Sequence, residues 1–341
     1  MRATIQTVGI AILLAVTLPG SVVAGQAASR KSQPVIDMHI HAVDVADFGP
    51  GPAVCSDNRT IAWNGWDQRK PFDLAESGTC ASIMWPAPKD DASLLRETLA
   101  AFKRYNVVSA VTSGPVANVD KWRAAAPSRI IPAVSFFSGG YDSNGRPRMR
   151  DIAELRRLVQ EKRVAVFAEI TQQYRGMFPN DPLLEPYFAL AEELDIPVGI
   201  HMGEGPPGGA NVEGYEKYRV ALGNPLLLEE VLVRHPRMRV YVMHYGSPFV
   251  DDMIALMFSY PQVYVDVAQN NWGFPREHFN SQLKRLVDAG FSRRIMFGSD
   301  QMIWPQTIGL AIKTMNDAPF LTDQQKRDIL YNNAARFLRL K

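Results

Sequence analysis

The sequence predicts a (β/α)8 barrel, the TIM-barrel architecture, with a long insertion after the first strand. Three observations support this fold class. Short apolar runs alternate with helix-period segments from residue 34 onward, as expected of a parallel sheet covered on both faces. The length of 341 residues suits one barrel with insertions. No glycine-rich dinucleotide fingerprint follows the first run, which argues against the alternative, an open doubly wound sheet.

Eight runs rich in apolar and β-branched residues are expected to form the barrel strands. Each run is short and is followed by polar or turn residues, as is typical of buried parallel strands. The runs occupy residues 34–41, 107–112, 130–137, 164–170, 196–201, 239–244, 263–267 and 295–297.

The segments between the strands carry apolar residues at helical spacing. In segment 90–105, for example, Leu94, Leu95, Leu99 and Phe102 fall on one stripe, which would face the sheet. Helices are predicted at residues 90–105, 119–126, 151–162, 183–194, 226–234, 251–260, 277–289, 306–315 and 323–338.

Two connections are much longer than usual. Residues 42–89 are rich in Gly, Pro and Trp and are expected to be irregular, and residues 202–224 carry six glycines, which would form either a mobile lid or a tight static loop. The first insertion holds both cysteines, Cys55 and Cys80. In an oxidising compartment they would pair across the insertion; otherwise they are two unrelated thiols.

The N-terminus has the pattern of a cleaved secretory signal. Arg2 supplies a positive charge, residues 8–18 are an apolar run too short to span a bilayer, and small residues place the cleavage site after Ala24 or Ala28. The alternative is an uncleaved anchor or a tail. We therefore expect a periplasmic or secreted protein without a membrane anchor, divided into a signal peptide (1–24), a flexible mature N-terminus (25–33) and the barrel (34–341).

The composition limits the partners of the chain. A net charge of +2, from 37 basic and 35 acidic residues, gives no electrostatic reason to expect binding to nucleic acid or to an anionic membrane surface. The expected partner is a small molecule, and the sequence predicts no oligomeric state.

Metal-competent side chains gather at the carboxyl ends of the predicted strands. His39 and His41 are two residues apart on the first strand and therefore point to the same face. Barrel enzymes place their active sites at this end, and imidazole with carboxylate suits zinc and related divalent ions. The other residues at this position are Glu169 near the end of the fourth strand, His201 and His244 ending the fifth and sixth, and Asp300 following the eighth.

Each of these signals is weak alone, since a single histidine after an apolar run is more often a core or loop residue. His235, at the end of a predicted helix before Pro236, and His278, within a predicted helix, are of that ordinary kind. Four of six histidines at strand ends is a pattern that random scatter rarely produces. The alternative for Asp300 is a structural cap, and for Glu169 an ion pair with Arg175 or another base.

As a set, these motifs resemble the amidohydrolase superfamily, specifically its amidohydrolase-related branch. The resemblance spans residues 34–338 and rests on Asp37-Met-His-Ile-His41, His201, His244 and Gly298-Ser-Asp300.

The resemblance implies that His39, His41, His201 and Asp300 hold the main ion. It implies that His244 binds a second ion or acts as acid and base. The family often carries a carboxylated lysine on the fourth strand, where this sequence has a glutamate. We therefore expect one or two ions, zinc being the first choice, with the glutamate as a further ligand.

The branch includes hydrolases, lactonases and nonoxidative decarboxylases. We expect a hydrolase that uses a metal-activated water to cleave an amide, ester or lactone bond, with Asp300 accepting the proton of water and His244 donating to the oxyanion or leaving group. A nonoxidative decarboxylase on the same site is the alternative, and a noncatalytic metal- or ligand-binding barrel is a third possibility. Export favours hydrolysis, which needs only water.

Two residues are candidates for substrate binding. Arg175 follows Glu169 by six residues and would clamp a carboxylate, and Trp304 follows the eighth strand. Together with Trp63 and Trp66 of the first insertion, Trp304 would suit an apolar or aromatic ligand. The alternatives are an intramolecular ion pair for the arginine and a protective cover over the barrel for the tryptophans.

Overall fold

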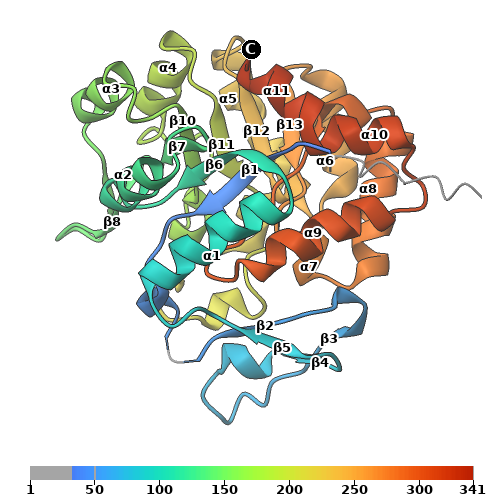
Figure 1. The fold of residues 1–341 in the computed structure, drawn as a ribbon. Coiled ribbons are helices and arrows are strands. Elements are labelled where there is room, and N and C mark those ends of the chain that lie inside the picture. Colours follow the sequence, from blue (N-terminus) through green and yellow to red (C-terminus); the bar gives the residue numbers. More distant parts are fainter. Residues whose placement is uncertain (1–32, 50, 341) are drawn as a thin grey trace, which may run out of the picture. The chain divides into compact units, whose positions relative to one another are not determined.

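A barrel of eight parallel strands forms the centre of the computed structural model, which describes residues 33–49 and 51–340. The predicted (β/α)8 barrel is confirmed (Figure 1). The strands pair in chain order as β1 (Val35–His41), β6 (Val107–Ser113), β7 (Ile130–Val134), β10 (Val166–Ile170), β11 (Val198–His201), β12 (Val240–Met243), β13 (Val263–Asp266) and β14 (Ile295–Met296).

Backbone hydrogen bonds join the last strand region to the first. The amide of Met38 donates to the carbonyl of Phe297 over 2.9 Å, and the amide of Asp300 donates to the carbonyl of His39 over 2.7 Å. These bonds link the two ends of the strand order. The expected signal peptide, residues 1–24, lies outside the described residues, as does most of segment 25–33.

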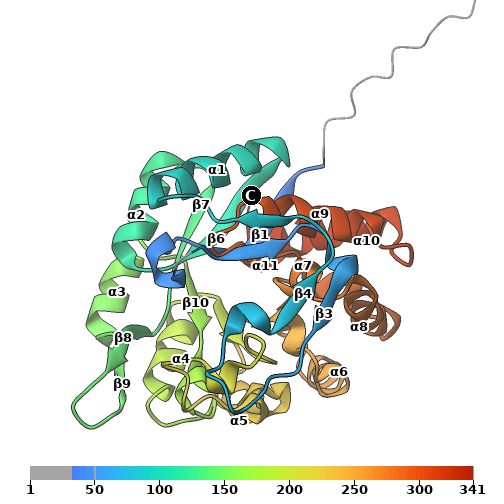
Figure 2. The same ribbon diagram turned by 90° about the horizontal axis from the view of Figure 1, so that it is seen from below.

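Helices surround the strands, as Figure 2 shows. Two expectations need correction: the helix expected at 226–234 begins as a 3-10 turn at Pro225–Leu228, and the helix expected at 323–338 is interrupted by a π-helical segment at Asp328–Asn332. The helices are α1 (Asp91–Arg104), α2 (Val116–Ala125), α3 (Ile152–Gln160), α4 (Glu185–Glu193), α5 (Glu229–Arg234), α6 (Val250–Ser259), the unpredicted short α7 (Asn270–Gly273), α8 (Arg276–Asp288), α9 (Gln306–Asp317), α10 (Asp323–Arg327) and α11 (Asn333–Leu338).

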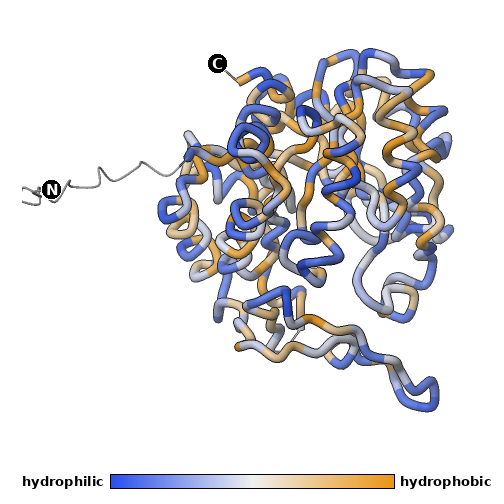
Figure 3. Tube along the Cα trace, turned by 90° about the vertical axis from the view of Figure 1, so that its right-hand side faces the viewer, coloured by the Kyte–Doolittle hydropathy of each residue, from blue (hydrophilic) through white to orange (hydrophobic). Residues whose placement is uncertain are grey.

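Alternating strand residues build two separate parts of the core. Those facing the barrel interior, such as Met38, Tyr241 and Met296, pack with Phe337 of α11, and those facing outward pack against the surrounding helices. The hydropathy of the chain follows this division: Figure 3 shows apolar colour along the barrel strands and on the helices around them. The polar residues of the strand ends are therefore held on a rigid frame. In the described part of the chain, no helix has the length and apolar character needed to cross a membrane.

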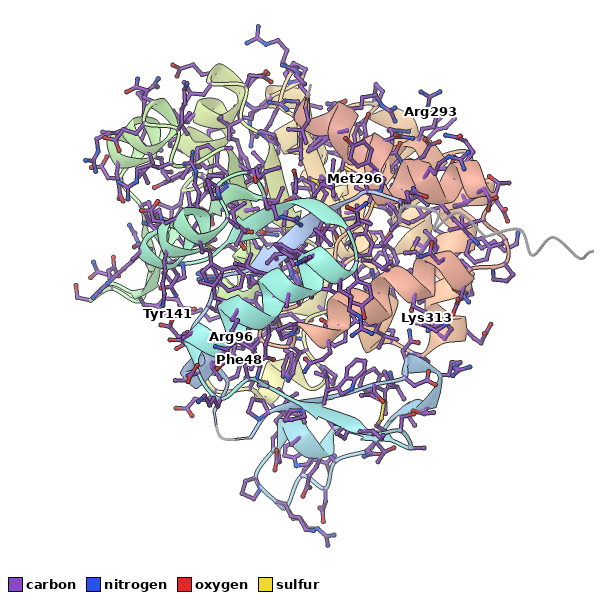
Figure 4. All side chains as sticks on the ribbon, in the orientation of Figure 1. Phe48, Arg96, Tyr141, Arg293, Met296 and Lys313 are labelled. Atoms are coloured by element: carbon purple, nitrogen blue, oxygen red, sulfur yellow. A yellow bond between two sulfur atoms is a disulfide. The ribbon has the colours of Figure 1, made fainter. Side chains whose placement is uncertain are left out.

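The first insertion is more regular than expected. It forms two small antiparallel sheets, one from β2 (Ala53–Cys55) and β5 (Met84–Pro86) and one from β3 (Ile61–Trp63) and β4 (Gly78–Cys80). A disulfide joins Cys55 to Cys80 across a Cα–Cα distance of 5.8 Å, and its sulfur–sulfur bond is visible in Figure 4.

The insertion contacts loops that follow the carboxyl ends of three barrel strands. The Asn58 side chain donates to the carbonyl of Asn271 over 3.0 Å, after β13, and the Trp304 indole donates to the carbonyl of Pro52 over 3.3 Å, after β14. The ring of Phe72 lies against Gly208, after β11. The insertion therefore covers part of the end where the candidate site lies.

A second correction concerns the third barrel strand, which was expected to continue to residue 137. It ends at Val134, and the chain then forms a hairpin of β8 (Phe137–Tyr141) and β9 (Pro147–Met149). The continuous run of apolar and β-branched residues had hidden this break.

Candidate metal centre

The two histidines of β1 meet an aspartate from the last strand region. His39 Nε2 and His41 Nε2 are 3.1 Å apart. Asp300 Oδ1 lies 3.0 Å from the Nε2 of His41 and 3.7 Å from that of His39. The hydrogen bond from the Asp300 amide to the His39 carbonyl places the carboxylate here, because it fixes the two backbones side by side.

Glu169 stands between this group and a second pair of histidines. Its Oε2 lies 3.6 Å from the Nε2 atoms of both His39 and His41. Its Oε1 lies 2.5 Å from His201 Nδ1 and 3.4 Å from His244 Nε2. One carboxylate therefore faces all four strand-end histidines, two with each oxygen.

The six residues form three overlapping groups in which the potential ligand atoms lie within 4.8 Å of one another. The structure thus brings together all six residues selected from the sequence as metal ligands. Glu169, His39 and His244 are each shared by two groups. The three groups are His39, His244 and Asp300; His39, His41 and Glu169; and Glu169, His201 and His244.

This arrangement fits a divalent cation. Two imidazole nitrogens that face each other at 3.1 Å cannot both carry a hydrogen, so at least one of them presents a lone pair. Asp300 Oδ1 is buried and has no hydrogen-bond donor in good geometry among the described residues. Nitrogen and oxygen donors that converge in this way are the ligands that zinc and similar ions take in proteins.

The charges of the cluster are strongly coupled. Burial opposes the positive charge of His39, but the Asp300, Asp266 and Glu169 carboxylates outweigh burial and raise the pKa of His39 well above its ordinary value. Burial likewise opposes the charge of Asp300, but His39 and His41 outweigh it and lower the pKa of the Asp300 carboxyl to about 2. A cation that binds here would therefore displace protons.

The other two histidines differ from each other. Burial and the neighbouring His244 lower the pKa of His201, which favours a neutral ring. For His244, burial is outweighed by the hydrogen bond to Glu169 and by the charges of Asp300 and Asp266, so its pKa is raised. Without a bound ion, the His201 ring is therefore more readily neutral than the His244 ring.

Strained backbone marks the loops that carry the site. His244 (φ 58°), Tyr245 (φ 42°), Gln269 (φ 59°), Asp300 (φ 47°) and Met302 (φ 44°) all adopt the left-handed region, which is unfavourable for residues with a Cβ. Such residues persist only where the surrounding structure fixes them, and they concentrate at functional sites.

Two buried aspartates that were not selected from the sequence support the site. Asp37 Oδ1 accepts hydrogen bonds from the amides of His39 (3.1 Å) and Ser299 (2.9 Å), and burial raises the pKa of Asp37 to about 7. Asp266, at the end of β13, accepts a hydrogen bond from the His244 amide over 2.8 Å. Asp37 lies inside β1 and Asp266 ends β13, and an acidic residue within an apolar strand was the signal available in the sequence.

Gly298 allows the last strand region to approach His39. A Cβ at this position would lie 3.0 Å from the Cβ atoms of both His39 and Ala268. The glycine of the Gly298-Ser-Asp300 motif therefore serves close packing behind the site.

Tyr174 connects the cluster to the second long loop. Its hydroxyl lies 3.1 Å from His201 Nε2, and its ring stacks with Tyr218 at a centroid distance of 5.5 Å. The Tyr218 hydroxyl in turn accepts a hydrogen bond from the Gly205 amide over 2.8 Å. Of the two expectations for loop 202–224, these contacts favour the static loop.

The two candidate substrate residues both pack against other side chains. Arg175 donates to the Thr171 hydroxyl over 2.7 Å, and its guanidinium lies over the Phe137 ring at 4.0 Å. Trp304 is buried and packs edge-to-face with Phe48 at 5.6 Å. The contacts of Trp304 match the alternative role, a cover over the barrel end.

A cleft of about 1120 Å³ opens beside the cluster, between the first insertion and loop 204–211. Trp63, Trp66, Phe72 and Phe274 line it, and none of the six potential ligands does so in the described part of the chain. Glu204 borders both regions, because its side chain lines the cleft and its carbonyl oxygen lies 3.3 Å from His201 Nε2. The cleft thus adjoins the cluster at Glu204 and is lined by none of its six potential ligands.

Comparison with known proteins agrees with this geometry. The family model described as Amidohydrolase matches residues 36–340. A search of curated proteins found no significant match.

Solved structures with the same fold cover nearly the whole chain at low identity. An IDCase from Metarhizium anisopliae is 16% identical with a TM-score of 0.56, covering 90% of this chain and 97% of that one. A probable 2-pyrone-4,6-dicarboxylic acid hydrolase from Acinetobacter baumannii, with citric acid bound, is 13% identical with a TM-score of 0.55, covering 90% and 99%. A 4-oxalomesaconate hydratase from Rhodopseudomonas palustris is 14% identical with a TM-score of 0.51, covering 89% and 95%. At such identities the likeness concerns the fold.

Proposed function

Because the chain belongs to the amidohydrolase family, we propose that it is a metal-dependent hydrolase that cleaves an amide, ester or lactone bond of a small molecule. One observation carries the proposal: four histidines and two carboxylates converge at the carboxyl ends of the barrel strands, with Glu169 facing all four imidazoles. Family membership supports an enzyme that depends on a metal, and the choice of hydrolysis is our proposal.

We propose zinc, as one ion or two, as the cofactor. His39, His41, His201 and Asp300 would hold the main ion, with Glu169 as a further ligand. His244 would bind a second ion or, in a one-ion site, act as the acid. When bound, such an ion lowers the pKa of a water molecule and polarises a carbonyl group.

The residues of the chain would then move the protons. Asp300 is an anion at neutral pH, since its pKa is lowered to about 2, so its carboxylate can accept a proton from the attacking water. The raised pKa of His244 favours a protonated ring, which can donate from Nε2 to the leaving group. The neighbouring Glu169 Oε1, 3.4 Å away, supports that charge.

The substrate would reach the cluster from the side of Glu169 and His41. Their side chains are each 15% exposed, against 1% for His39. We propose that Arg175 and Trp304 contact the substrate outside the metal-ligand cluster, because both side chains pack against other residues of the protein.

A panel of small amides, esters, lactones and aromatic carboxylic acids, tested on zinc-, manganese- and cobalt-loaded protein, examines the proposal. Release of titratable acid without CO₂ supports hydrolysis. Release of CO₂ would instead establish the alternative, a nonoxidative decarboxylase. Elemental analysis that finds no metal, together with no gain in activity or melting temperature on adding metal, would contradict a metal-dependent enzyme of either kind.

We also propose that the protein works in the periplasm or outside the cell. The disulfide between Cys55 and Cys80 supports this location, because disulfides persist mainly in oxidising compartments. Localisation of the native protein by cell fractionation tests it, and recovery in the cytosol would contradict it.

A further inference from the structure

Asp266 lies behind the metal-ligand cluster and contacts two of its histidines. It is the last residue of β13 and is fully buried. Its Oδ1 accepts hydrogen bonds from the amides of His244 (2.8 Å) and Ala268 (3.1 Å). One oxygen of the carboxylate is therefore committed to backbone groups, which fixes the side chain in one orientation.

The other oxygen faces the ring of His39. Asp266 Oδ2 lies 3.3 Å from His39 Nδ1. Within the described residues, neither atom has a hydrogen-bond partner in good geometry, and both are buried. Because an unpaired buried donor or acceptor costs free energy, the two atoms are each other's natural partners.

The pairing determines which nitrogen of His39 carries the proton. A carboxylate can only accept, so Nδ1 must donate. In the neutral ring Nε2 then keeps its lone pair, and Nε2 is the atom that faces His41, Glu169 and Asp300 at 3.1–3.7 Å. Carboxylates that hold the rear nitrogen of a histidine in this way orient metal ligands in many proteins.

We propose that Asp266 is a positioning residue that fixes the tautomer and ring orientation of His39 and, through its other oxygen, the backbone of His244. The proposal rests on the proposed metal-dependent function. Among the other rear nitrogens, His41 Nδ1 lies 3.2 Å from the Ser113 hydroxyl and His244 Nδ1 lies 3.1 Å from the Ala268 carbonyl, so both have neutral partners. Asp266 gives His39 a charged one.

The substitution Asp266→Asn separates the two functions of the carboxylate. Its Oδ1 can still accept from the His244 and Ala268 amides, so the backbone contacts remain. The amide nitrogen replaces Oδ2 and can only donate, which forces the proton of His39 from Nδ1 to Nε2. We expect the affinity for zinc, measured by competition with a chromophoric chelator, to fall about 10–100-fold.

A matched control is Asp37→Asn. Asp37 is equally buried and also binds backbone amides, but it accepts from the backbone of His39 rather than from its ring. Because burial raises the pKa of Asp37 to about 7, both variants are compared above pH 8, where this control also removes a buried negative charge and a loss of zinc affinity caused only by missing charge would appear in both. We expect the larger loss in Asp266→Asn.

The tautomer can be read without metal and without a substitution at Asp266. Protein labelled with ¹⁵N-histidine and kept at alkaline pH, where the imidazole is neutral, should show the proton of His39 on Nδ1, with the signal assigned by its loss in His39→Gln. A proton on Nε2, or a folded Asp266→Asn protein that binds zinc as tightly as the wild type, would overturn the proposal. If the wild type binds no zinc, the proposed function fails, but the tautomer measurement still decides the role of Asp266. The same measurement decides it if the Asp266→Asn variant does not fold.

Discussion

Removing the disulfide of the first insertion should lower the free energy of unfolding by an amount that follows from the length of the loop it closes. Cys55 and Cys80 are separated by 25 positions. In the chain-entropy model, closing a loop of this size restricts the unfolded state by about 3 kcal/mol. For the unit of residues 33–341, an unfolding entropy of about 2.1 cal/mol/K per residue sums to roughly 0.65 kcal/mol/K, so the melting temperature should fall by about 5 °C.

Scanning calorimetry of the wild type and of the Cys55→Ser/Cys80→Ser variant, each with and without reductant, measures this effect. Reductant should lower the melting temperature of the wild type to that of the variant, and it should leave the variant unchanged, which controls for other effects of the reagent. Equal melting temperatures for the oxidised wild type and the variant would refute the reasoning. Such a result would mean that the insertion does not unfold together with the barrel.

Four further predictions concern the site and the N-terminus. Asp300→Asn should keep much of its metal and lose on the order of 10²–10⁴ in kcat, because it removes the proton acceptor; a near-normal kcat at full metal content would assign the proton transfer to another group such as His244. Glu169→Gln should reduce the metal content toward one ion per chain in a two-ion site and leave it unchanged in a one-ion site, as elemental analysis will show. Joint replacement of His39 and His41 by Ala should abolish metal binding, and retained stoichiometric metal would disprove the ligand assignment. Mass spectrometry of the native protein should find an N-terminus within residues 25–29, whereas a chain that keeps the first residue would argue against a cleaved signal.

The six potential ligands could be selected from sequence because strand geometry constrains them. His39 and His41 share a face through the two-residue period of a strand, and the carboxyl ends of parallel barrel strands meet at one end. His201 and His244 end apolar runs, so their positions followed from the strand prediction. No such rule gives distances, and the central place of Glu169, with both oxygens among histidines, became visible only in three dimensions.

Other features depended on contacts that a linear pattern does not contain. Asp266 is one acidic residue in the run Val263–Asp266 followed by another valine, and only its distance from His39 distinguishes it from an ordinary strand-end residue. The pairing of Cys55 with Cys80 requires the Cα geometry of two small sheets. The end of β7 at Val134 was hidden because the residues that follow it are also good strand formers.

The hydrogen bond between the Asp300 amide and the His39 carbonyl also bears on how the protein is made. It joins residues 261 positions apart in the sequence. During synthesis, a nascent chain that has not yet exposed Asp300 lacks one wall of the site, so early fragments would have an incomplete set of ligands. Contacts of such long range are formed late and slow the folding of a domain. An ion bound by residues of both the first and the last strand regions would then hold the two ends of the barrel sheet together. Because only the folded protein offers this set of ligands, binding would raise the free energy of unfolding.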